Sequence, residues 1–269
     1  MPTALQMPQV QIANQRFIQE LVIEHGPITE LGRFFLKAIG ALNDLGVTLE
    51  IATPEQLVTA NRDNADNWLP LVQTFDPRWS DVSSENQISL IGRMNGRVIA
   101  AHAMRYFDWR TTTYHDEIES FRLLYRDPEN DRLPGESVAI TSTAARTISG
   151  RVAFSGAAWC HPDMRGNGLS RIMPRIGKAL ALARWDVDRI VAIMNEGVHS
   201  KGFAPRFGYH GVDWGVRYEN CRCGIVYVAV LWMNRPQLEE YISAYLGGEK
   251  VDPAVLDRGN ENERARRVS

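Results

Sequence analysis

Apolar residues recur at helical spacing near the start of the chain. Phe17, Ile18, Leu21 and Val22 form one stripe, which the pair Gly26-Pro27 interrupts. A wider stripe follows, and it contains Ile28, Leu31, Phe34, Phe35, Ala38, Ile39 and Leu42. The pattern predicts two amphipathic helices, which either pack on the rest of the protein or make a homodimer contact.

From Val47 onward, short alternating runs predict strands, and helical stripes separate them. Asn95-Gly96 lies between two alternating runs, which favours a β-hairpin with a two-residue turn. The expected strands are 47–51, 88–94, 97–104, 151–160, 189–194 and 223–232. The expected helices are 54–61, 66–74, 169–184, 199–206 and a last one from its cap Asn234 to Leu246. Residues 106–135 form an irregular insert, and 138–147 fit either a strand or a loop.

The expected organisation has three parts. Residues 1–46 form an N-terminal helical extension, residues 47–247 form the main domain, and residues 248–269 form a charged tail. The tail contains too few large apolar side chains to predict a fixed structure, and the residues up to about Asn14 are also expected to be poorly ordered. Helix 169–184 is expected to bury one face against a sheet, formed by Ile172, Ile176, Ala179, Leu180 and Ala183.

Composition excludes several classes of protein. A hydrophobic share of 44% and a charged share of 23% are ordinary for a soluble globular protein. A net charge of −2 with a pI near 6.3 gives no general attraction to nucleic acid or to anionic lipid. We see no run long enough to span a membrane and no secretory signal, so we expect a cytoplasmic protein.

The three cysteines do not form a disulfide framework. Cys221 and Cys223 are expected on one strand with their side chains on the same face, where a bridge between them is unfavourable. The Cys and His residues do not have zinc-like spacing either, so we predict no metal.

The most informative segment is the run from His161 to Ser170, between a predicted strand and a predicted helix. Gly166 and Gly168 lack a Cβ atom, so the turn can use positive φ and an anion can approach the main chain closely. The first N–H groups of a helix lack helical partners and lie at the positive end of its dipole. We therefore expect a ligand that carries phosphate.

This loop resembles the acetyl-CoA-binding motif of the GNAT superfamily of N-acyltransferases. Arg165 and Gly168 match the motif, Ser170 stands where the family has Gly or Ala, and His161-Pro162-Asp163 is similar to the family's lead-in. The resemblance covers roughly residues 47–232 in element order. It implies an acetyl-CoA-dependent N-acetyltransferase in which an amine attacks directly within a ternary complex. It also implies that the pyrophosphate is held by the main chain of Arg165, Gly166, Asn167, Gly168, Leu169 and Ser170.

The same resemblance implies the fold and the path of the cofactor. It implies an α/β (α+β) fold with a mixed, mostly antiparallel sheet between helices, in which the parallel strands 151–160 and 189–194 splay apart. The N–H groups near Trp159 and Cys160 would bind the pantetheine arm and polarise the acetyl carbonyl. Asn195 would contact the arm, although an Asn at this place is also typical of a helix cap.

The catalytic groups are less well defined. The family's general-acid tyrosine is replaced by Phe203, so His199 or Tyr209 would have to donate the proton to the leaving thiolate. The alternative is that His199 is a surface residue and that Tyr209 belongs to the core. Cys160 fits an inert buried thiol better than a nucleophile, and His161 fits a role in shaping the loop better than a role as a base.

The insert 106–135 offers a general base and a lid. Its acidic and aromatic residues would suit a cationic amine, with Glu117 or Glu119 as the base. Alternatively, Ile118, Phe121, Leu124 and Tyr125 pack the insert against the protein as an ordinary solvated helix.

Three other functions are alternatives to acetyl transfer. A non-catalytic acyl-CoA-binding or regulatory domain would explain the missing tyrosine and the altered last position of the motif. An interaction protein that uses the N-terminal helices would leave the glycine loop unexplained. A Rossmann dinucleotide site is disfavoured because the third glycine and the acidic residue of that motif are missing.

Overall fold

The computed structural model describes residues 6–248, in which eight strands form one sheet. The strand order is β1-β2-β3-β5-β6-β8-β7-β4, and only the β5–β6 pair is parallel. The strands are β1 Thr48–Ala52, β2 Gln87–Met94, β3 Arg97–Trp109, β4 Ser137–Ile140, β5 Gly150–Cys160, β6 Arg189–Asn195, β7 Gly211–Cys221 and β8 Gly224–Asn234. The expected mixed and mostly antiparallel sheet is thereby confirmed.

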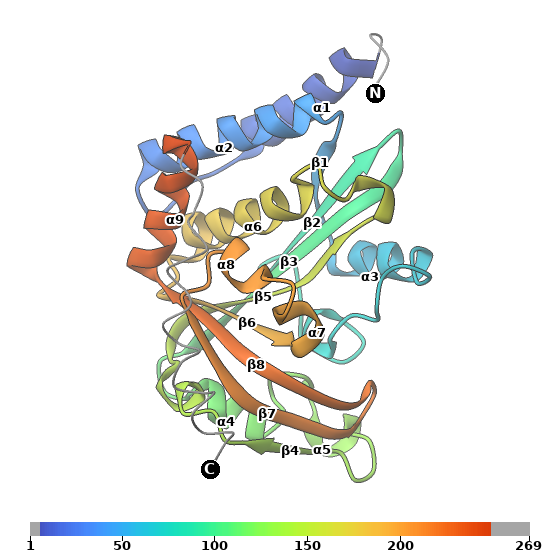
Figure 1. Cartoon of the computed structure of the whole chain (residues 1–269), viewed down its shortest axis with the longest axis vertical. Coiled ribbons are helices and arrows are strands. Elements are labelled where there is room, and N and C mark those ends of the chain that lie inside the picture. Colours follow the sequence, from blue (N-terminus) through green and yellow to red (C-terminus); the bar gives the residue numbers. More distant parts are fainter. Residues whose placement is uncertain (1–5, 249–269) are drawn as a thin grey trace.

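Helices cover both faces of the sheet (Figure 1). One face carries α1 Gln6–Glu20, α2 Ile28–Asp44, α6 Leu169–Trp185 and α9 Arg235–Gly247. The other face carries α3 Pro54–Asp63 and α4 Tyr114–Glu119, and the short helices are α5 Pro128–Asp131, α7 Glu196–His199 and α8 Phe203–Arg206. Single 3₁₀ turns lie at Gln73–Phe75, Ala144–Thr147 and Pro162–Met164.

The two N-terminal helices share the hydrophobic core of the main domain. Phe17 of α1 is buried with residues of β1, α6 and α9, as is the predicted stripe of α2 from Leu31 to Leu42, whereas Ile28 at its start is exposed. Helix α6 is buried on more sides than the single stripe suggested, because α2 and α9 cover the side that the sheet leaves open. Ile176, Ala179, Leu180 and Ala183 are buried as expected, whereas Ile172 is only half-buried.

The parallel pair β5–β6 is short, and beyond it the two strands separate. Only Val152 to Ser155 of β5 pair with β6, from Arg189 to Ala192. Beyond Ser155, β5 stays paired with β3 as far as Cys160, and β6 stays paired with β8 as far as Asn195. A bulge at Ala157, whose φ is +50°, bends β5 at this point. The splayed parallel strands that the resemblance to GNAT enzymes implied are therefore confirmed.

Besides the strand β7, which was not predicted, and the expected helix 199–206, which is divided between α7 and α8, four local predictions were wrong. Helix α1 begins at Gln6, and Asn14 is buried because its side chain bonds to Asn43, Val47 and Leu49. Residues 66–74 do not form a helix, since Pro70 disfavours helical backbone at the residue before it and removes an N–H donor.

The other two concern the second half of the sheet and the insert. Cys221 ends β7 and Cys223 lies in the turn before β8, so the two do not share a strand. The insert is more regular than expected, since β3 extends to Trp109 and α4 and α5 follow it. The ambiguous residues 138–147 divide into the end of β4 and a 3₁₀ turn.

Within residues 6–248, no helix has the length and apolar character needed to span a membrane. The expected charged tail lies outside the described residues, except for Gly248.

Candidate active site

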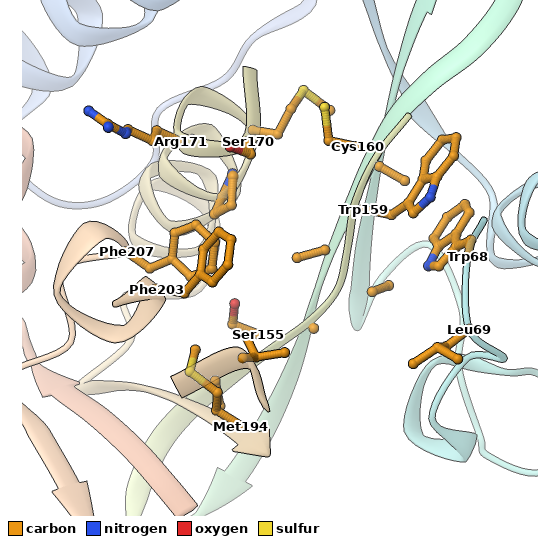
Figure 2. Close-up of a pocket in the computed structure, with 18 of the residues that line it drawn as sticks. Trp68, Leu69, Ser155, Trp159, Cys160, Ser170, Arg171, Met194, Phe203 and Phe207 are labelled. Carbon is orange, nitrogen blue, oxygen red and sulfur yellow. The ribbon is translucent and has the colours of Figure 1, made fainter. Parts of the chain in front are cut away.

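A cleft of about 960 Å³ opens where β5 and β6 separate (Figure 2). Its walls are the end of β5, the end of β6 with α7 and α8, the N-terminus of α6, and the loop of residues 67–75. The predicted phosphate loop therefore lies at the same place as the gap between the splayed strands. Trp159, Cys160, Arg165, Gly166, Asn167, Gly168, Ser170 and Asn195 all line the cleft.

The loop before α6 has the backbone conformation that its glycines predicted. Gly166 has a φ of +85°, and Gly168, the N-cap of α6, has a φ of +88°. A Cβ atom built on either glycine would meet no atom within 4 Å. The glycines are thus required by the left-handed backbone, and the space in front of them is free for a ligand.

Several main-chain donors of this loop have no protein partner. The N–H of Arg165 donates to the Pro162 carbonyl at 3.2 Å, and that of Leu169 donates to the Asn167 side chain, also at 3.2 Å. Within the described part of the chain, four loop N–H groups donate to no protein acceptor, those of Gly166, Asn167, Gly168 and Ser170. Leu169 itself is fully buried, so it contributes packing rather than a free donor.

His161 fixes the start of the loop, as expected. Its main-chain N–H donates to the Ile99 carbonyl at 2.8 Å, and its Nδ1 lies 3.2 Å from the main-chain nitrogen of Asp163. Its Nε2 lies 2.6 Å from the Arg97 guanidinium. Both ring nitrogens are occupied, which supports a structural role for this histidine.

Three arginines lie around the phosphate loop, and only Arg165 was predicted from the sequence. Arg171 and Arg206 line the cleft together with Arg165. Arg171 lies one residue beyond the predicted motif, and Arg206 comes from α8, far away in the sequence. Helical periodicity would have placed Arg171 on the same turn as Gly168, but nothing local to Arg206 indicated its position.

The splayed end of β5 offers a main-chain donor to the cleft. The bond from His161 to Ile99 defines a hydrogen-bonded pair, and such pairs alternate along an antiparallel ladder. The N–H and carbonyl of Cys160, which is opposite Ala100, therefore point away from β3 and into the gap. Trp159 instead presents its side chain, whose Nε1 donates to the Asn67 carbonyl at 3.0 Å.

Asn195 is a helix cap, as one of its two readings predicted, and its contact with a cofactor stays a prediction. Its Oδ1 accepts from the N–H of Val198 at 2.9 Å and caps α7. The side chain is nevertheless exposed and lines the cleft at the end of β6. Among the described residues its amide nitrogen has no acceptor, so this group stays free to donate to a ligand.

The structure brings one of the three predicted catalytic residues to the cleft. Tyr209 lines the cleft from beneath and is only 3% exposed. Burial raises the pKa of Tyr209, partly offset by the nearby hydroxyl of Ser155, so the phenol stays protonated. His199 does not line the cleft; its ring packs edge-on against Trp214, with ring centres 5.4 Å apart.

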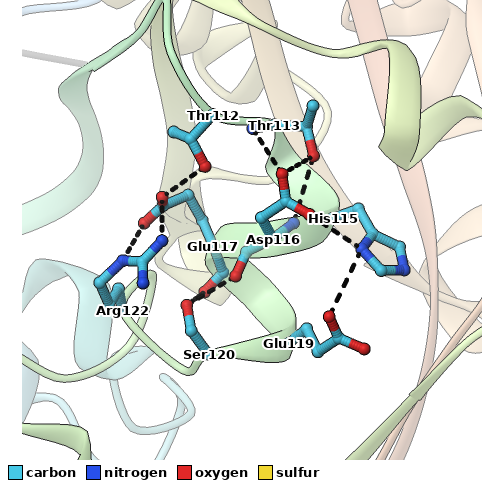
Figure 3. Close-up of polar contacts among 8 residues, drawn as sticks. All are labelled: Thr112, Thr113, His115, Asp116, Glu117, Glu119, Ser120 and Arg122. Atoms are coloured by element: carbon cyan, nitrogen blue, oxygen red, sulfur yellow. Dashed lines mark hydrogen bonds and ion pairs between the residues drawn. The ribbon is translucent and has the colours of Figure 1, made fainter.

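Glu117 is not brought to the cleft. It is buried in the insert, where its carboxylate accepts from the Arg122 guanidinium at 2.7 Å and from the Thr112 hydroxyl at 2.9 Å (Figure 3). The packing alternative for the insert is confirmed, because Ile118, Phe121, Leu124 and Tyr125 are all buried. The insert is therefore not an acidic lid over the cleft.

Next to Glu117, three side chains of α4 approach one another closely enough to hold a cation. The ligand atoms of His115, Asp116 and Glu119 lie within 4.8 Å of one another. Asp116 already forms a capping box with Thr113, which explains the arrangement without an ion. The two carboxylates are exposed, as is common for acidic groups that bind no ion.

Cys160 has the character of an ordinary thiol. It is half-buried, and this burial raises its pKa more than the charge of Arg165 lowers it. The nucleophile is the thiolate, which this environment disfavours.

The loop of residues 67–75 forms the apolar wall of the cleft. This wall was not predicted, because residues 66–74 were expected to form a helix. The Trp68 ring stacks on the Trp159 ring at 4.9 Å with an interplanar angle of 6°. Leu69 is 79% exposed beside them (Figure 2). Phe75 lies against Gly156, where a Cβ atom would approach the ring to 2.3 Å. This close contact explains why β5 has a glycine there.

No protein-family model and no curated protein matches this chain. Solved structures similar to it include a putative acyl-CoA N-acyltransferase from Klebsiella pneumoniae, with 12% identity over 70% of this chain and 97% of that chain and a TM-score of 0.36. The NAA60 protein of Arabidopsis thaliana in complex with a bisubstrate analogue has 8% identity over 70% and 97% of the two chains and a TM-score of 0.44. The aminoglycoside acetyltransferase AAC(6')-Ib in complex with coenzyme A and kanamycin has 14% identity over 72% and 98% and a TM-score of 0.39. At these values the likeness carries no argument about activity, and function is inferred from the cleft itself.

Proposed function

We propose that this protein is an acyl-CoA-dependent N-acyltransferase that moves an acetyl group from acetyl-CoA to an amine. The observation that carries the proposal is the set of N–H groups at the mouth of the cleft, those of Gly166, Asn167, Gly168 and Ser170, that have no acceptor among the described residues. Unpaired donors at the start of a 17-residue helix suit a pyrophosphate, and three arginines add positive charge around them. Such a site fits coenzyme A as a co-substrate.

The rest of the cleft fits the remainder of that molecule. From the loop, the pantetheine arm would run between β5 and β6 toward Ser155. The Cys160 N–H and the Asn195 amide lie along this path and could bond to the arm. The amine would then attack the thioester carbonyl directly, which requires orientation more than any covalent enzyme intermediate. The raised pKa of the Cys160 thiol supports a mechanism without an acyl-cysteine.

The acceptor proposed here differs from the cationic amine that the sequence suggested. The charged side chains among the described cleft residues are the three arginines, and the opposite wall is formed by Trp68, Leu69 and Phe75. A strongly cationic acceptor would be repelled from such a site. We therefore favour a small amine with an apolar or aromatic body, bound as the free base.

Binding of coenzyme A tests the proposal. Replacing Gly168 by Val should weaken the affinity for CoA at least tenfold, about 1.4 kcal/mol, because the side chain strains the left-handed backbone and fills the space of the phosphate. Gly96→Val is the matched control: Gly96 has a φ of +78° and free space around it, but it lies in a hairpin turn away from the cleft. Isothermal titration calorimetry on both folded variants gives the comparison.

Two results would count against the proposal. If the wild-type protein binds neither CoA nor acetyl-CoA, or if both glycine variants lose affinity equally, the loop is not the phosphate site. If CoA binds at the loop but a broad panel of amines releases no thiol from acetyl-CoA, the protein is a non-catalytic acyl-CoA-binding domain.

A further inference from the structure

A serine lies at the point where β5 and β6 separate. Ser155 is the last residue of β5 that pairs with β6, opposite Ala192. It lines the cleft, and Figure 2 shows it between Met194 and Phe203. Five residues of strand, about 16 Å, separate it from Cys160 near the phosphate loop. An extended arm anchored at the loop therefore brings its far end to this serine.

A buried histidine holds the Ser155 hydroxyl in place. His102, on the adjacent strand β3, is 1% exposed, and its Nε2 lies 3.0 Å from the Ser155 Oγ. The opposite nitrogen of the ring fits against Gly177 of α6, where a Cβ atom would approach Nδ1 to 2.4 Å. Glycine in the middle of a helix costs about 1 kcal/mol, and here it makes room for the ring.

The surroundings of His102 determine its protonation state. Burial, together with the charge of the nearby Lys178, lowers the pKa of His102 to about 3, so the ring is neutral near pH 7. Nδ1 is buried and has no partner among the described residues. An orphaned N–H is less favourable than an orphaned lone pair, so we place the single proton on Nε2. His102 then donates to the Ser155 oxygen and leaves the serine proton free.

The proton of the Ser155 hydroxyl can point in two directions, toward Tyr209 or toward the cleft. Tyr209, whose phenol is protonated, lies near the Ser155 hydroxyl on the core side. On the other side the hydroxyl faces the cleft, whose walls here are the apolar side chains Met194, Phe203 and Phe207. Hydrogen bonds are stronger in such a poorly hydrated place than in water.

We propose that Ser155 is a catalytic residue of the acyl transfer, and that His102 is its positioning residue. The proposal rests on the function proposed above. It supplies the proton donor that the chain lacks at Phe203, and it assigns that role to a strand residue of the cleft floor rather than to a helix.

The proton balance needs no change in charge of the protein. As the amine nitrogen bonds to the carbonyl carbon and the carbon–sulfur bond breaks, the nitrogen must lose a proton and the sulfur must gain one. The Ser155 oxygen accepts the proton from nitrogen through its free lone pair while it gives its own proton to sulfur. The products are an amide and the free thiol of CoA, and Ser155 returns to its starting state.

The test compares variants of Ser155 with the amine that releases thiol fastest in the wild-type protein. Ser155→Ala should lower kcat about 100-fold, within the usual range for loss of a proton-transfer group, while KM and the CoA affinity stay within threefold. Ser155→Thr, which retains a hydroxyl, should recover most of the activity. Ser142→Ala is the control, because it removes a buried hydroxyl that bonds to Asp213 outside the cleft.

Variants of His102 separate positioning from packing. His102→Gln keeps an N–H donor for Ser155 and should retain activity within threefold. His102→Leu fills similar space without a donor and should lower kcat about tenfold with little effect on CoA affinity. Thermal unfolding and CoA titration confirm that each variant is folded.

Each result supports the proposal or contradicts it. Equal activity of Ser155→Ala and the wild-type protein would overturn the role of Ser155 and leave the N-acyltransferase function intact. An acyl group found on Ser155 by mass spectrometry of quenched reactions would also overturn it, because the serine would then be a nucleophile. A wild-type protein that transfers no acyl group to any amine would contradict the proposed function and this inference together.

Discussion

The phosphate loop and the insert both contain many polar groups, but they differ in whether those groups are hydrogen-bonded to other protein groups. In the insert, Glu117 is bonded to Arg122 and Thr112, and Asp116 caps α4. In the loop, four main-chain donors have no acceptor within residues 6–248. Both regions looked functional in the sequence, since both combine charged and aromatic or glycine residues.

The difference shows which kind of polar cluster indicates a ligand. A cluster whose donors and acceptors satisfy one another stabilises the fold and has nothing left to offer. A cluster with unpaired donors at a concave surface is incomplete without a partner, and here the most suitable partner is an anion. The predictions below test this contrast by altering one region at a time.

The largest effect is expected from the arginines that flank the loop. The double substitution Arg165→Ala with Arg171→Ala should weaken CoA binding about 30-fold at low salt, on the order of 2 kcal/mol, because charge-assisted bonds to phosphate are lost. The loss should shrink as salt is added, since these side chains are exposed. Titration calorimetry at two salt concentrations measures both quantities.

A control with the same change in net charge uses two exposed arginines that do not line the cleft. Arg33→Ala with Arg146→Ala should leave CoA affinity unchanged within twofold. If this pair weakened binding as much as the loop pair, the loop would have no special role and general charge would explain the affinity.

A smaller effect is expected in the insert, and on a different property. Glu117→Gln should lower the free energy of unfolding by about 1–2 kcal/mol, because a mostly buried carboxylate loses its bond to the Arg122 guanidinium. CoA affinity and thiol release should not change. Urea denaturation measures the stability. A large loss of activity in the folded variant would contradict this structural role and indicate that Glu117 is a catalytic residue.

The smallest effect concerns a buried lysine next to the cleft. Lys178 is fully buried, bonds to the Phe207 carbonyl and lies 3.9 Å from the centre of the Tyr209 ring. Burial lowers its pKa well below the usual value. Between that lowered pKa and the usual one near 10.4, only the unfolded chain binds the lysine proton, so the free energy of unfolding should rise with pH.

Lys178→Met should therefore be more stable than the wild-type protein by about 1 kcal/mol near pH 7, and this advantage should shrink by pH 9.5. Urea denaturation of both proteins at the two pH values gives the difference, in which the titration of shared groups cancels. A constant advantage across this range would show that the lysine is already charged in the folded protein.

Local sequence signals were sufficient for the phosphate loop and for the elements beside it. The strand before the loop and the helix after it differ from prediction by a single residue at one end each, because the glycines and the apolar spacing are local and strong. The resemblance to GNAT enzymes added the splayed pair, which spacing alone does not specify.

The remaining features of the site depend on contacts between distant segments. Arg206, His102 and Trp68 reach the cleft or its floor from different elements, and no local pattern distinguishes them from ordinary surface or core residues. Glu117 failed as a predicted base for the same reason, since its partner Arg122 was visible in the sequence but their bond was not. Tertiary packing decides these cases.

The short parallel pairing of β5 and β6 has a mechanical consequence. Within residues 6–248, four residue pairs form the only ladder that joins the half-sheet β1-β2-β3-β5 to the half-sheet β6-β8-β7-β4. The coenzyme proposed for the cleft would touch both halves and form a second bridge between them. Binding of the proposed coenzyme would then add to the resistance of the sheet to opening along this line, by an amount that rises with ligand concentration.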